Sequence, residues 1–147
     1  MTTNDPRLTG GAWRDGLDDD VVEAVGAMTE ALEAAEVARG HLFAFHRLIG
    51  TTDFTLEKAI GKLREAGHPD LARRLTDELL GRNVLPGRWT FQIVEEYDET
   101  YHSVFRELEA EVRKLTHDVP HVHEADLKRQ RRTAGRPGHE ATPGSPA

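Results

Sequence analysis

The sequence predicts an all-α protein with a four-helix bundle-like fold, in which two long helices pack with a short helical hairpin and a C-terminal extension follows. Apolar residues recur at steps of three and four over residues 19–49 and again over residues 88–115. Two shorter stretches, 54–66 and 69–80, carry the same spacing on either side of a Gly-His-Pro break. No stretch alternates convincingly as a β-strand does.

The first long helix is expected to begin at Asp19 or Asp20, where carboxylates suit the positive end of a helix dipole. It is expected to stop at Gly50. Gly26 and Gly40 inside it are weak points at which the helix could bend. Many inward positions are alanines, and this face is longer than the short hairpin can cover. We therefore expect the protein to form a homodimer.

The second long helix, residues 88–115, has an apolar stripe that is interrupted by one acidic residue. The stripe comprises Phe91, Val94, Asp98, Tyr101, Phe105, Leu108, Val112 and Leu115. At 100° per residue, Asp98 lies inside the apolar arc of this helix. A carboxylate in a protein core is costly unless it is paired or protonated, so Asp98 should have a partner.

Two polar residues of the first long helix, Arg39 and His46, fall in the apolar arc of that helix and can supply the partner. If the two long helices pack antiparallel, His46 approaches the early turns of the second one. One interpretation is therefore a buried His–Asp or Arg–Asp hydrogen bond that fixes the register of the helices.

A second interpretation is a metal site with carboxylate and imidazole ligands inside the bundle. Its candidate ligands are His46, Glu95, Asp98 and His102. The spacing departs from the Glu-x-x-His pattern of di-iron bundles, because no histidine stands three residues after Glu95. A third interpretation is a hydrolase in which Asp98 and a histidine form an acid–base pair, although no nucleophile is identifiable.

Two arginines, Arg82 and Arg88, stand just before the second long helix and are candidates for binding an anion. Trp89 and Phe91 would then form an apolar wall beside the anion. The alternative is that Trp89 packs at the entry of the helix and both arginines are solvated.

The chain divides by composition into four segments. Residues 1–17 are expected to be a flexible N-terminal arm, from which Trp13 could dock on the domain, and residues 18–115 form the helical domain. Residues 116–133 are a histidine-containing, basic extension with room for one short helix. The histidines there could bind zinc weakly, but the simpler expectation is that they are solvated. Residues 134–147 hold three prolines and three glycines and are expected to be disordered.

Composition excludes several classes of protein. The 147 residues suit one domain, and the net charge of -7 argues against general nucleic-acid binding. The absence of cysteine excludes disulfides, thiolate metal sites and cysteine nucleophiles. No apolar run approaches the roughly 20 residues needed to cross a bilayer, and the N-terminus lacks the pattern of a signal peptide. We therefore expect a cytoplasmic protein without a membrane partner.

The sequence favours a non-catalytic helical interaction or assembly module with a buried His/Asp polar pair, whose partner is a second copy of itself. The alternative is a metal-dependent or acid–base enzyme with its site in the bundle core. A third option is weak nucleic-acid contact through the basic residues between 128 and 136. No cofactor is expected except in the metal-dependent version of the enzyme alternative, in which the site would hold a divalent metal. No phosphate-loop, dinucleotide-binding, serine-hydrolase or zinc-finger signature is present.

Overall fold

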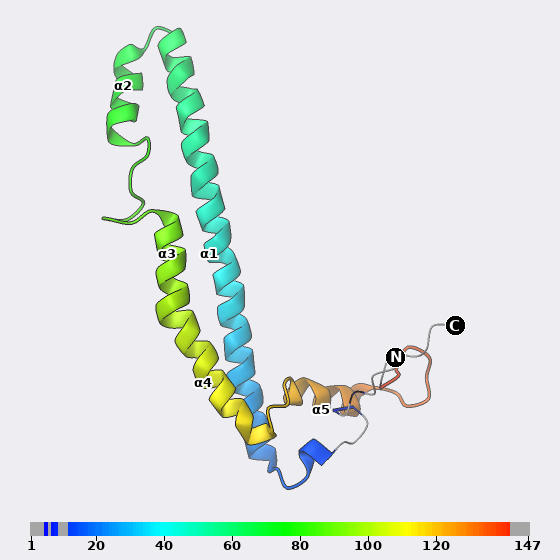
Figure 1. The fold of residues 1–147 in the computed structure, drawn as a ribbon. Coiled ribbons are helices and arrows are strands. Elements are labelled where there is room, and N and C mark those ends of the chain that lie inside the picture. The colour runs from blue at the N-terminus through cyan, green and yellow to red at the C-terminus, as the bar shows by residue number, and fades with distance from the viewer. Residues whose placement is uncertain (1–4, 6, 9–11, 142–147) are drawn as a thin grey trace. The chain divides into compact units, whose positions relative to one another are not determined.

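The computed structural model describes residues 5, 7–8 and 12–141, and every regular element in these residues is helical (Figure 1). The all-α prediction is therefore confirmed. The main helices are α1 (Asp19–Glu65), α2 (Pro69–Glu78), α3 (Thr90–Glu96), α4 (Ser103–Arg113) and α5 (Val122–Arg131). A π-helical segment, Tyr97–His102, joins α3 to α4, and short 3-10 turns occupy Ala12–Arg14 and Lys114–Thr116.

Helix α1 is one continuous helix of 47 residues, so the predicted stop at Gly50 is wrong. The threonines that follow Gly50 do not cap a new helix. Their hydroxyls donate to carbonyls one turn earlier, from Thr51 to Arg47 O at 3.2 Å and from Thr52 to Leu48 O at 2.8 Å. The carboxylate of Asp53, the next residue of α1, accepts the backbone N–H of Gly81.

The predicted hairpin is made by the end of α1 and by α2. Gly67 adopts a positive φ of 86°, which glycine tolerates without strain, and the N–H of His68 donates to Leu63 O at 2.8 Å. Pro69 then starts α2 at a position where its missing N–H has no cost. Ile60 of α1 and Ala72 of α2 are both buried.

The second long helix forms as three consecutive pieces, and its middle is wider than an α-helix. A π turn holds more residues than an α turn, so it rotates everything after it relative to a 100° wheel. Tyr101, Leu108 and Leu115 of the predicted stripe are accordingly 54–56% exposed. The residues that follow each of them, His102, Glu109 and Thr116, are buried at 0–7% exposure. The sequence wheel is therefore wrong at these three positions, whereas Phe105 and Val112 of the stripe are half-buried, as the wheel predicts.

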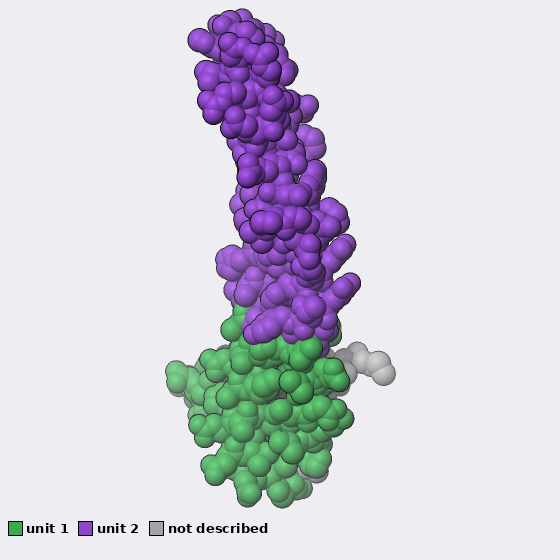
Figure 2. All heavy atoms as spheres, turned by 90° about the vertical axis from the view of Figure 1, so that its left-hand side faces the viewer, with its two compact units in different colours: residues 1–34, 104–147 green, residues 35–103 purple. Residues whose placement is uncertain are grey.

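The chain forms two compact units, residues 1–34 with 104–147 and residues 35–103 (Figure 2). In the first unit the core joins the start of the chain to its end. Trp13 is buried there with Val22, Val25 and Val122, which confirms that this tryptophan docks on the domain. Partly buried valines and a leucine pack around this cluster.

The short helix expected within residues 116–133 is present as α5. It lies against α1 closely enough that an ideal Cβ on Gly26 would be 2.6 Å from the Cβ of His123. The flexible arm and disordered tail stay predictions, because residues 1–4, 6, 9–11 and 142–147 lie outside the described part of the chain. No helix in the described residues is long and apolar enough to cross a membrane.

Candidate functional site

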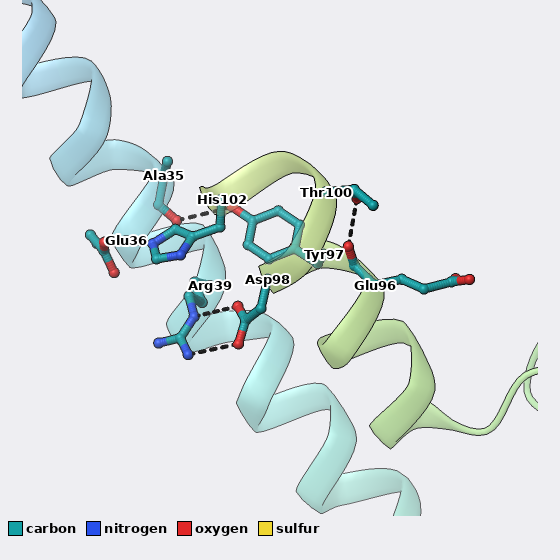
Figure 3. A network of polar contacts seen from close by, with 8 residues as sticks. All are labelled: Ala35, Glu36, Arg39, Glu96, Tyr97, Asp98, Thr100 and His102. Atoms are coloured by element: carbon teal, nitrogen blue, oxygen red, sulfur yellow. Dashed lines mark hydrogen bonds and ion pairs between the residues drawn. The ribbon is translucent and has the colours of Figure 1, made fainter. Parts of the chain in front are cut away.

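Asp98 meets Arg39 of α1, not a histidine. The guanidinium binds the carboxylate with two nitrogens, Nε to Oδ1 at 2.6 Å and Nη2 to Oδ2 at 2.9 Å (Figure 3). Of the two pairs left open by the sequence, the structure thus forms the Arg–Asp pair. Both side chains keep about a third of their surface exposed, so Asp98 is only partly removed from water. Asp98 is the second residue of the π-helical segment.

The hydrogen bonds from Arg39 lower the pKa of Asp98 below its ordinary value of 3.8, against a smaller opposing effect of burial. The same contact raises the pKa of Arg39. The guanidinium also lies 4.8 Å from the centre of the Phe43 ring, one turn further along α1. Arg39 and Asp98 therefore stay ionised at neutral pH and act as a fixed polar clamp between α1 and the π-helical segment.

A second polar contact in the same place joins His102 to Glu36. His102 Nε2 and Glu36 Oε1 lie 2.6 Å apart, and the imidazole is nearly buried while the carboxylate is half exposed. Beside it, the Tyr97 hydroxyl donates to the backbone carbonyl of Ala35 at 3.4 Å (Figure 3). Three successive contacts thus tie the π-helical segment to a short stretch of α1, residues 35–39.

His46 lies elsewhere, at the N-terminal end of α3. Its Nδ1 is 2.6 Å from the Thr90 hydroxyl, a hydrogen bond that either tautomer can make. The expected approach of His46 to Asp98 is therefore wrong. The reason is the register of the two helices, because Arg39, two turns before His46, occupies the position opposite Asp98.

The four proposed metal ligands are consequently not brought together as one site. His46, Asp98 and His102 each have a different partner, and Glu95 is exposed. Within the described residues, the group whose ligand atoms lie within 4.8 Å of one another is Glu33, His121 and Glu124, all exposed. His121 and Glu124 belong to the histidine-containing extension, and Glu33 was not singled out from the sequence. Metal binding stays a prediction.

The two candidate anion-binding arginines have different surroundings. Arg88 is neutralised by Glu96, with Nε to Oε2 at 3.0 Å and Nη2 to Oε1 at 2.7 Å. Arg82 donates from Nη1 to the backbone carbonyl of Glu78 at 3.2 Å. No carboxylate in the described part of the chain lies within 4.0 Å of its guanidinium. Of the pair, Arg82 is thus the one with charge available to a ligand.

Sequence reasoning missed the residues of α1 that face the segment between α2 and α3. Gly50 was predicted to end one helix and Phe54 to begin the next, yet both line one cavity with Asp53, Trp89 and Phe91.

No family model matches the chain, and neither the curated proteins nor the solved structures searched include a significant match. The fold and the contacts define a class: an all-helical protein in which polar pairs join the long helix α1 to the π-helical segment between α3 and α4.

Proposed function

We propose that the protein is a helical assembly module that acts as a homodimer, with the middle of α1 as its self-association surface. The observation that carries this proposal is the distribution of apolar side chains. Within the described residues, fifteen large hydrophobic side chains are exposed, whereas six are buried: Trp13, Val22, Val25, Ile60, Val94 and Val122. A soluble chain with more large apolar side chains in water than in its core gains free energy by covering them.

The middle of α1 is the part of the helix with least charge. Residues 40–52 contain one ionised side chain, Arg47, and include five large apolar or aromatic residues and two histidines, spread around the whole circumference of the helix. A helix that is apolar all round is usually buried all round. Val37 and Leu48 are nevertheless 62% and 64% exposed, and they point away from the side that carries His46.

Charge along α1 favours a second copy as the partner and an antiparallel arrangement. Residues 19–36 of the helix contain six acidic and no basic residues, whereas residues 39–65 contain five basic and three acidic ones. An antiparallel pair centred on residues 40–52 brings the acidic part of each helix beside the basic part of the other. A parallel pair brings like charges together, which is unfavourable.

The test is the mass of the protein by sedimentation velocity over a range of concentrations. We expect a dimer for the native chain and a monomer for the double variant Val37→Glu, Leu48→Glu. The matched control places the same two charges on α2 and on the residue that follows it, in Leu71→Glu, Leu79→Glu, where about half of each native side chain is exposed. This control should stay dimeric, and far-UV circular dichroism should show native helicity in both. A monomeric native chain would refute the proposal.

The orientation has its own test, because the chain contains no cysteine and single cysteines can be added cleanly. Ala44 and Thr55 lie on the same side of α1 as Leu48. In the antiparallel dimer the two copies of Ala44 lie near the two-fold axis, while the two copies of Thr55 are on the order of 27 Å apart along the helix. A short bismaleimide should therefore link Ala44→Cys dimers and not Thr55→Cys dimers. Linkage of both variants would indicate a parallel pair.

A further inference from the structure

A cavity of about 460 Å³ lies between α1 and the segment that connects α2 to α3. This volume is within the range of small-molecule sites, roughly 300–1,000 Å³. The floor on the α1 side includes Gly50, where an added Cβ would meet no atom within 4 Å. The glycine thus leaves open a space that almost any other residue would fill.

Aromatic side chains surround this cavity. Phe54 is 71% exposed, and Trp89 and Phe91 are each 48% exposed. Three aromatic side chains around one hollow leave much apolar surface in contact with water. A ligand with an apolar body would cover this surface, and the rings would give it flat walls to pack on.

The polar groups of the cavity differ in how many of their hydrogen-bonding atoms already have a partner. His46 is bonded to Thr90, and one carboxylate oxygen of Asp53 accepts the Gly81 N–H at 2.8 Å. Arg82 has one donor on a backbone carbonyl and no carboxylate of the described chain within 4.0 Å. A guanidinium has five N–H donors in a planar fork that matches a carboxylate, so Arg82 retains the capacity to bind one.

We propose that this cavity binds an apolar monocarboxylate, with the hydrocarbon or aryl body against Phe54, Trp89 and Phe91 and the carboxylate on Arg82. The site lies on the opposite side of α1 from Val37 and Leu48, so it does not depend on the proposed dimer. Asp53 holds the connecting segment through Gly81, and its charge restricts the anionic group to the Arg82 end of the cavity.

The experiment is a titration of the full-length protein with three probes of equal length and different charge: octanoate, octan-1-ol and octylamine. Isothermal calorimetry gives the affinity, and tryptophan emission reports occupancy, because Trp89 lines the cavity whereas Trp13 is buried in the other unit. We expect saturable binding in the order octanoate, octanol, octylamine. The emission response to octanoate should disappear in Trp89→Phe. Absence of saturable octanoate binding, or tighter binding of octylamine, would overturn the proposal.

Two pairs of variants locate the site. Gly50→Leu fills the cavity and should abolish octanoate binding, while Gly40→Leu, at another exposed glycine of α1 with open space at its Cβ, should not. Arg82→Gln should weaken octanoate binding about tenfold and leave octanol binding unchanged. Arg88→Gln is its matched control, because Arg88 is already paired with Glu96. Equal effects within either pair would show that octanoate binds elsewhere.

Discussion

The contact between Gly26 and His123 leads to a prediction whose sign depends on the structure. In the interior of an exposed helix, Gly→Ala stabilises by about 1 kcal/mol, because alanine loses less backbone entropy on folding. At Gly26 the new Cβ would lie 2.6 Å from the Cβ of His123 and 3.1 Å from its Cγ. Ordinary contacts between carbon atoms are about 3.5–4.0 Å, so α5 would have to move by about 1 Å.

The expected size of the effect follows from these two opposing contributions. Overpacking of this kind costs about 1–3 kcal/mol, and the gain in helix propensity offsets about 1 kcal/mol of it. Gly26→Ala should therefore lower the free energy of unfolding by about 0–2 kcal/mol. Gly40→Ala, where nothing lies within 4 Å, should raise it by about 1 kcal/mol. The two variants should therefore change the free energy of unfolding in opposite directions, although each replaces one glycine of α1 with alanine.

The assay is urea denaturation in a Trp89→Phe background, in which Trp13 is the remaining tryptophan and reports on the core that includes Val122. The unfolding of the Gly40→Ala variant is followed by far-UV circular dichroism. Because the clash involves the Cβ of residue 123, His123→Gly should relieve it in the double variant, whereas His123→Ala should not. If Gly26→Ala stabilises the protein as Gly40→Ala does, α5 does not pack on α1 as described.

Two further predictions concern polar contacts. Asp98→Asn should lower the free energy of unfolding by about 1 kcal/mol at pH 7, because it removes one charge from a partly exposed ion pair. Because the pKa of Asp98 is lowered in the folded state, the carboxylate gives its full stabilisation at pH values above the ordinary pKa of 3.8. This contribution fades as the pH falls through the lower pKa of the folded state. Urea titrations at pH 7 and at successively lower pH values should show the two proteins converge, and a constant difference would contradict the assignment. Thr116→Val should lower the free energy of unfolding by about 1 kcal/mol, because the buried hydroxyl lies 3.0 Å from Arg113 O and 3.3 Å from Val119 O. Thermal denaturation measures this effect, and an unchanged melting temperature would show that these contacts contribute nothing.

The sequence predicted the helical class and most helix positions because apolar spacing is a local property. Residues 69–80 were expected to be helical and residues 116–133 to have room for a short helix, and α2 and α5 lie within these ranges. Trp13 was expected to dock, and it does, because a large apolar side chain has few alternatives to burial. The predicted helix end at Gly50 is wrong because glycine and threonine are compatible with both a helix end and a helix interior. Thr51 and Thr52 resolve that choice through bonds to carbonyls one turn earlier.

The candidate site was predicted only in part. That Asp98 needs a partner followed from its place in an apolar stripe, and Arg39 was among the residues named for it. Which of Arg39 and His46 lies opposite depends on the register of two helices that are far apart in sequence, and no local pattern encodes that register. The cavity at Gly50 and Phe54 also depends on where the segment after α2 returns to α1.

The sequence by itself determined that this chain is helical, acidic and rich in apolar stripes. The tertiary structure decided which side of each stripe is covered. The π-helical segment is the clearest case, because Leu108, which follows its wider turn, is exposed whereas Glu109 is buried. A wheel drawn at 100° per residue assumes one helical geometry throughout, and only contacts made across the fold, such as those of Arg39 and Glu36 with this segment, reveal where that assumption ends.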